Sequence, residues 1–234
     1  MPVARRRASP DARSLTARVY NDLKRDILHC ELRPGQDVYE GQLAERYGVS
    51  KTPIREALNT LRQEGYVQVM PRRGYRIAPV SVQDVQHIFQ VRLLLEPSAA
   101  ELAAQRVSGE QLAELRRLAQ HRSTHSRSER MAANRAFHLA VAEASGNPRL
   151  TAFIGRLLED VERLYHLGID LNAAEVVHSD HHQALLDALL KGDHHLARDT
   201  MAEAVQASRK RVMEALIGSE AAARALYVVS GEHA

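Results

Sequence analysis

The sequence predicts a mostly α-helical protein of two domains, and three observations support this. Apolar residues recur at helical spacing along most of the 234 residues. Strand-like runs occur in one region, after Glu64 and before Ser81, around a Pro/Gly turn. Residues 1–80 carry 15 Lys+Arg against 9 Asp+Glu, a net of +6, whereas residues 81–234 carry 17 against 20, a net of −3. Such a division indicates a first domain that binds a polyanion and a second domain with another task.

The composition is that of a folded protein, with 44% hydrophobic and 26% charged residues. No apolar run approaches the roughly 20 residues needed to cross a bilayer. The N-terminal MPVARRRASPDARS has no apolar segment after its arginines, so it does not resemble a secretory signal. We therefore expect a cytosolic protein, in which the single Cys30 is a free thiol.

The first domain begins with an apolar stripe that predicts a helix from about Leu15 to Cys30, ended by Pro34-Gly35. The stripe consists of Leu15, Val19, Leu23 and Ile27. A second short helix is expected in YEGQLAERYGVS, where Gly48 leaves the helix in a left-handed conformation. Ser50 is then expected to cap a third helix, with Pro53 in its first turn.

The runs YVQVM and YRIAPV flank PRRG and predict a β-hairpin with Arg72, Arg73 and Gly74 at its tip. Three helices followed by a basic hairpin make a winged helix-turn-helix. On the third helix one face is apolar, and the opposite face carries Lys51, Thr52, Arg55, Asn59 and Arg62. The first residues of such a recognition helix enter the major groove of DNA, where Arg can contact guanine. A solvated charged helix face is the alternative interpretation.

From Ser81 onward only helical patterns remain, at 82–106, 109–122, 128–145, 148–168, 174–191 and 193–217. Pro97 is expected to kink or divide the first of these, so the predicted bundle has six or seven helices. The expected organisation is a disordered basic tail at 1–13, a DNA-binding domain at 14–80, a helical bundle at 81–217 that binds an effector and dimerises, and a frayed tail at 218–234.

The segment LRPGQDVYEGQLAERYGVSKTPIREALNTLRQEGYV with RRGYRI resembles the winged-helix domain of the GntR family of bacterial transcription regulators. The segments NRAFHLAVAEASGN and HHQALLDALLKGDHHLA resemble the effector domain of its FadR-like (FCD) subfamily. The resemblance implies that Lys51, Thr52 and Arg55 face the operator, that Ser50 lies near phosphate, and that Gly74 is in the wing tip. Family members often have Arg where this chain has Gly41 and Lys51, which leaves the operator sequence open.

The resemblance also implies a metal centre built from one Asp and three His of the bundle. The matching positions in this chain are Asn134, His138, His182 and Ala204, so two ligands match and two do not. If a divalent metal such as zinc binds there, His138 and His182 must hold it. His178, His181, His194 and His195 are not expected to replace the missing ligands.

Without a metal, the same region would bind an effector through hydrogen bonds and an arginine. Arg92 is the candidate anchor, with Glu96 one turn later as its alternative, internal partner. Asn134, His138 and His182 are the other candidate effector-binding residues. Members of the subfamily bind small carboxylates and, in fewer cases, acyl-CoA.

Taken together, these features predict a dimeric bacterial repressor that binds double-stranded operator DNA, is controlled by a small carboxylate, and is not an enzyme. Two other functions stay open. One is a metal-dependent helical hydrolase fused to a DNA-binding head, and the other is a DNA-binding dimer without an effector.

Overall fold

The computed structural model describes residues 10–120, 127–167 and 175–218. It divides the chain into two compact units, Met1–Val80 and Ser81–Ala234. The first described helix begins at Pro10, inside the segment expected to be a basic tail. The tail predictions for residues 1–9 and 219–234 fall outside the described residues.

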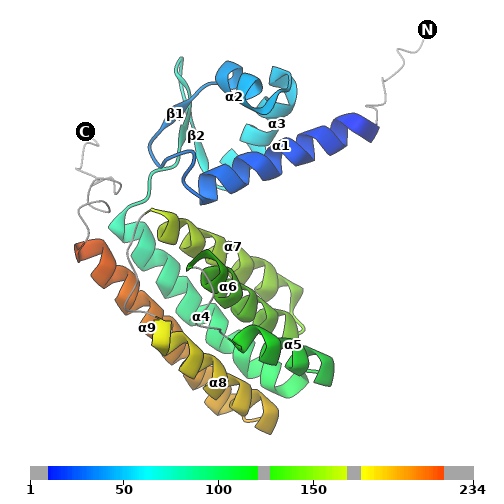
Figure 1. Ribbon diagram of the computed structural model, residues 1–234, viewed down its shortest axis with the longest axis vertical. Coiled ribbons are helices and arrows are strands. Elements are labelled where there is room, and N and C mark those ends of the chain that lie inside the picture. Colours follow the sequence, from blue (N-terminus) through cyan, green and yellow to red (C-terminus); the bar gives the residue numbers. More distant parts are fainter. Residues whose placement is uncertain (1–9, 121–126, 168–174, 219–234) are drawn as a thin grey trace. The chain divides into compact units, whose positions relative to one another are not determined.

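In the N-terminal unit three helices enclose an apolar core, and a small sheet lies beside them (Figure 1). The elements are α1 (Pro10–Leu28), β1 (Asp37–Val38), α2 (Glu40–Tyr47), α3 (Lys51–Gln63), β2 (Val67–Met70) and β3 (Gly74–Ile77). The predicted stripe on the first helix is confirmed, because Val19, Leu23 and Ile27 are buried in this core. Burial of one such side chain contributes about 1.5–3 kcal/mol. This packing holds α3 against α1.

The turn between α2 and α3 has the predicted left-handed glycine and lacks the predicted serine cap. Gly48 has φ 65°, and the next amide, Val49 N, donates to Ala44 O at 3.0 Å. Ser50 stands at the N-cap position of α3, but its side chain makes no capping hydrogen bond. The third helical position is Pro53, which has no N–H to donate to the serine hydroxyl. The expected cap at Ser50 was therefore wrong.

A buried carboxylate fixes α2 on α1. Asp26 Oδ2 accepts hydrogen bonds from Tyr47 Oη at 2.7 Å and from Arg46 Nη2 at 2.8 Å. Burial, followed by the bond to Asp26, raises the pKa of the Tyr47 phenol, which keeps it a donor at neutral pH. Helix α2 is thus tied to α1 by directional bonds as well as by the core.

The predicted hairpin is present, and it belongs to a three-stranded antiparallel sheet in the order β1-β3-β2. The sequence did not predict β1, which is only two residues long. Asp37 pairs with Arg76 across the strands, where Arg76 donates from Nε at 2.7 Å and from Nη2 at 3.1 Å. This charged pair joins the segment before α2 to the wing.

The C-terminal unit is a helical bundle in which α4 contacts α6, α7, α8 and α9 (Figure 1). Its described helices are α4 (Val82–Arg106), α5 (Gly109–Ala119), α6 (Arg127–Ala144), α7 (Pro148–His166), α8 (Glu175–Lys191) and α9 (His194–Gly218). The predicted division at Pro97 does not occur, since α4 continues through this buried proline. Ala99, Ala100 and Ala103 beyond it are buried, so packing holds the helix together after the lost backbone bond.

Side-chain caps set the starts of several bundle helices. Ser81 forms a capping box with Asp84, and Ser108 forms one with Gln111. Asn147 caps α7 ahead of Pro148. Among the described helices, none has the length and apolar character that crossing a membrane requires.

Candidate nucleic-acid interface and buried polar cluster

The two faces of α3 differ as the sequence predicts. Ile54, Ala57, Leu58 and Leu61 are fully buried in the core of the N-terminal unit. The exposed face carries Lys51, Thr52, Arg55, Asn59 and Arg62. The chain therefore presents a row of cationic and hydrogen-bonding groups on one rigid helix, which is the arrangement that a major-groove reader requires.

Arg55 is held in place by a carboxylate that the sequence did not single out. Glu40, at the start of α2, accepts from Arg55 Nε at 2.9 Å and from Nη2 at 2.7 Å, and also from Tyr75 Oη of the wing at 3.2 Å. These bonds lower the pKa of the Glu40 carboxyl, against the opposing effect of burial. The side chain of Arg55 is still 60% exposed, so its outer edge is open to a ligand. Glu40 thus orients the arginine and joins α2, α3 and β3.

The wing tip depends on a glycine. Gly74 has φ 82°, and a Cβ built on it would lie 2.8 Å from Val38 O and 3.1 Å from Cδ1 of Tyr39. Only glycine suits both this backbone conformation and this close approach of β1. The preceding Arg72 also has a positive φ, 63°, and both Arg72 and Arg73 are exposed. Two exposed arginines therefore lie in the tight turn at the tip of the hairpin.

In the C-terminal unit, four charged or polar side chains are buried close together. Arg92 and Glu96 of α4, His138 of α6 and His182 of α8 are each at most 4% exposed. Arg92 Nε donates to Glu96 Oε1 at 2.5 Å, and His138 Nδ1 lies 2.6 Å from Glu96 Oε2. The ring of His182 stacks on Phe137 at 3.9 Å and lies 5.5 Å from the ring of His138. Arg92 therefore pairs with Glu96, the partner expected from the sequence as the alternative to an effector.

Glu96 is the ionised centre of this cluster. Burial alone would raise the pKa of the carboxyl, but Arg92 and His138 outweigh that effect and lower it to about 2. An ionised carboxylate only accepts, so the Nδ1–H of His138 donates to it. Arg92 Nη1 and Asn134 Oδ1 are inaccessible to solvent and make no hydrogen bond within the described residues. Although Arg92 and Glu96 form an ion pair, the donor Arg92 Nη1 and the acceptor Asn134 Oδ1 therefore lack hydrogen-bond partners within the described residues.

Comparisons with known proteins identify both units. Residues 15–77 match the model of "Bacterial regulatory proteins, gntR family", and residues 87–207 match the FCD domain. The chain is 32% identical to the HTH-type transcriptional regulator McbR of Escherichia coli over 199 residues, which is 82% of this chain and 90% of McbR. The chain belongs to the GntR family, with an FCD domain.

Two further comparisons agree with this assignment. The solved structure of E. coli McbR/YncC superposes with a TM-score of 0.73 and 30% identity, over 86% of this chain and 97% of that one. The chain is also 33% identical, over 97 residues and 42% of each protein, to the HTH-type transcriptional repressor RspR of E. coli. The chain is therefore a DNA-binding transcription regulator and not an enzyme.

Gly41 and Lys51, the two positions at which the resemblance implies arginine, are neighbours in space. A Cβ built on Gly41 would lie 3.7 Å from Cε of Lys51 and 4.0 Å from its Nζ. Gly41 thus leaves room for the Lys51 side chain over the start of α2. Lysine has one compact ammonium group, whereas each arginine would have a planar guanidinium that can donate two parallel hydrogen bonds. The surface formed by Gly41 and Lys51 is therefore suited to contacts with phosphate or to single hydrogen bonds.

The buried cluster does not fit the metal centre that the FCD resemblance implies. Asn134 offers only an amide oxygen, Ala204 offers no ligand, and both oxygens of Glu96 are committed to Arg92 and His138. In the described part of the C-terminal unit, three metal-ligating side chains do lie close together at another place, namely Glu101, His194 and His195. Two imidazoles without a third ligand make a weak site, so we derive no role for a metal at His138 and His182.

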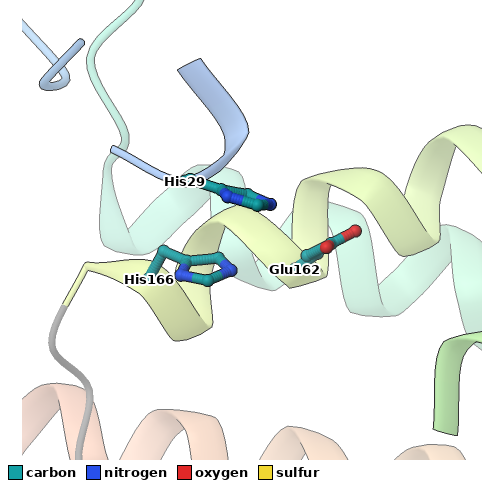
Figure 2. Close-up of side chains that lie close together, drawn as sticks. All are labelled: His29, Glu162 and His166. Atoms are coloured by element: carbon teal, nitrogen blue, oxygen red, sulfur yellow. The ribbon is translucent and has the colours of Figure 1, made fainter. Parts of the chain in front are cut away.

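A second pair of candidate ligands lies near the end of α7. Figure 2 shows Glu162 and His166 one turn apart on this helix, and His29, also drawn there, belongs to the N-terminal unit. Arg135 Nε lies 3.6 Å from Glu162 Oε2, so that carboxylate takes part in an ion pair within the bundle. Two ligands are too few for a metal site, and we assign none to α7.

Proposed function

We propose that the protein is a dimeric transcriptional repressor that reads operator DNA with the start of α3 and the wing. The exposed row on α3, with Arg55 aimed by Glu40, carries this proposal. Ser50, Lys51 and Thr52 would contact phosphate or base edges, Arg55 and Asn59 would contact bases, and Arg72, Arg73 and Gly74 would place the wing on the backbone. A regulator of this kind works on chromosomal DNA in the bacterial cytoplasm.

Repression is proposed because the GntR relative RspR is named as a repressor. It is tested by a reporter gene behind the protein's own upstream DNA. Deleting the regulator should raise expression, and supplying Arg55→Ala should not restore repression. A fall in expression on deletion would assign an activator instead.

Dimerisation would use the apolar residues that the bundle leaves exposed. Leu94 on α4 and Phe153 on α7 are 71% and 62% exposed, although these two helices pack together through a buried apolar cluster. A second copy of the chain is the proposed occupant, because a two-fold partner would place two recognition helices on the half-sites of a palindrome. Leu94→Glu should lower the mass measured by sedimentation from a dimer to a monomer, and Leu196→Glu, at a residue 44% exposed on α9, is the matched control.

The effector is proposed to be a small carboxylate bound beside Arg92. Arg92 Nη1 would donate to the carboxylate, and Asn134 Oδ1 would accept from a hydroxyl or amine group of the same ligand. His138 and His182 would line the same place. A carboxylate at 100 times its dissociation constant should stabilise the protein by about 2.7 kcal/mol, seen as a rise in melting temperature that Asn134→Ala reduces.

The mutual pairing of Arg92, Glu96 and His138 favours a second candidate, a DNA-binding dimer without an effector. In that case the cluster would only fix the packing of α4 on α6. A thermal-shift screen of small carboxylates that raises no melting temperature would support this candidate and contradict the effector proposal.

A further inference from the structure

A group of metal-ligating side chains lies where the last turns of α4 meet the start of α9. Glu101 comes from α4, and His194 and His195 are the first two residues of α9. The two helices pack side by side (Figure 1). One ligand atom from each of the three residues lies within 4.8 Å of the other two. Residues far apart in sequence are thus brought together by the helix pairing.

The nitrogen of His194 that faces Glu101 has no hydrogen bond. His194 Nδ1 is inaccessible to solvent and makes no hydrogen bond within the described residues. Its distance to Glu101 Oε1 is 3.9 Å, beyond hydrogen-bond reach. Two ligands of one tetrahedral zinc ion, each about 2.0–2.1 Å from the metal, lie about 3.3 Å apart. The observed distance of 3.9 Å is therefore closer to the separation of two ligands of one ion than to that of a hydrogen-bonded pair.

The second imidazole is presented on the same side. The rings of His194 and His195 have centroids 4.2 Å apart and planes inclined at 49°. The backbone that carries them is fixed, because Asp193 Oδ1 accepts from Leu196 N at 3.0 Å and Asp193 N donates to Ala188 O at 3.0 Å. Asp193 is thus occupied as a helix cap, and the two imidazoles remain as candidate ligands.

We propose that Glu101, His194 and His195 bind a divalent transition-metal ion, with water completing its shell. Two imidazoles and one carboxylate suit zinc, nickel and copper better than magnesium or calcium, which prefer oxygen ligands. Each side chain is partly exposed and can adjust its rotamer by the small movement that coordination requires. The site is separate from the positions of the family's metal centre, Asn134, His138, His182 and Ala204.

Such an ion would act as a cross-link between α4 and α9. Because the ligands come from two helices, binding would stabilise the folded bundle over the unfolded chain. The site would thus make the stability of the C-terminal unit depend on metal supply.

The test is a titration of the full chain, without an affinity tag and freed of metal by a chelator, with zinc chloride in a calorimeter. The wild type should bind one ion per chain at this site, and His194→Ala, His195→Ala and Glu101→Gln should each weaken binding at least tenfold. His87→Ala on the exposed side of α4 is the control, and it should bind as the wild type does. No binding by the wild type, equal binding by His194→Ala, or a loss with His87→Ala would overturn the proposal.

A second measurement separates loss of ligands from loss of fold. Melting followed by circular dichroism in chelator should give the same midpoint for His195→Ala as for the wild type, and zinc should raise only the wild-type midpoint. The electron paramagnetic resonance spectrum of the copper(II) form should show coupling to two imidazole nitrogens, and to one in His194→Ala. A midpoint of the wild type that zinc leaves unchanged, or a copper spectrum that His194→Ala leaves unchanged, would contradict the site.

Discussion

Arg55 of the recognition helix donates two hydrogen bonds to Glu40 at the start of the preceding helix. The pair fixes the direction of the guanidinium and leaves one edge of it facing outward. The pKa of the Glu40 carboxyl is lowered by Arg55, so the pair contributes stability above the ordinary pKa of 4.5 and loses it as pH falls below that value. At neutral pH the arginine is therefore already oriented for the DNA contact proposed above.

Replacing Glu40 by Gln should reduce discrimination between the operator and other DNA. The arginine would lose its orienting carboxylate, while the protein would lose one negative charge near the phosphates. We expect affinity for a scrambled duplex to rise slightly and affinity for the operator to fall, with a change in their ratio of about tenfold, or ~1.4 kcal/mol. Fluorescence anisotropy with both duplexes at several salt concentrations measures this.

Glu45→Gln is the matched control, because Glu45 is exposed on the same helix and changes the charge by the same amount. It should raise affinity for both duplexes equally. If Glu40→Gln and Glu45→Gln behave alike, Glu40 acts only through its charge and does not position Arg55.

Replacing Gly74 by Ala should destabilise the wing. The new Cβ would meet Val38 O at 2.8 Å, and the backbone at φ 82° disfavours any side chain. We expect a loss of about 1–3 kcal/mol in the free energy of unfolding of the N-terminal unit, measured by urea denaturation. Gly35→Ala is the control, since Gly35 has φ 78° with nothing within 4 Å of the added Cβ. Equal losses in both variants would mean that the contact with Val38 is unimportant.

Replacing Glu96 by Gln should destabilise the bundle strongly. Arg92 would keep a buried positive charge without its counter-ion, which costs about 3–5 kcal/mol. The double variant Arg92→Met with Glu96→Met should recover most of this, because it removes both charges and keeps the volume. Glu203→Gln, at an exposed site on α9, should unfold like the wild type in the same urea titration. A single variant as stable as the wild type would show that Glu96 is not the required partner.

Local periodicity was enough to predict much of this structure. The apolar stripe of α1, the two faces of α3 and the β2–β3 hairpin each follow from residues close in sequence. The failed cap at Ser50 was also a local matter. Pro53 is the third helical residue and lacks one of the two N–H groups that a capping serine can use, which could be seen in the sequence.

What the sequence could not give are relationships between distant residues. Strand β1 has only two residues and forms because it pairs with β3, where Asp37 lies opposite the distant Arg76. Glu40 has no feature in the sequence that marks it as the partner of Arg55. Likewise Glu96 was expected to pair with Arg92 one turn away, but its bond to His138 on another helix depends on how α4 packs against α6. Such contacts are set by tertiary packing, and the spacing of apolar residues along the sequence does not predict them.

The most direct test of the account is a footprint of the protein's own upstream DNA by the wild type and by Arg55→Ala, at equal protein concentrations. The wild type should protect a palindromic site whose half-sites lie about one helical turn apart. Arg55→Ala should lose about 1–3 kcal/mol at that site and much less for unrelated DNA, where only its charge contributes. Protection by Arg55→Ala equal to that of the wild type would contradict the central claim that the start of α3 reads the operator.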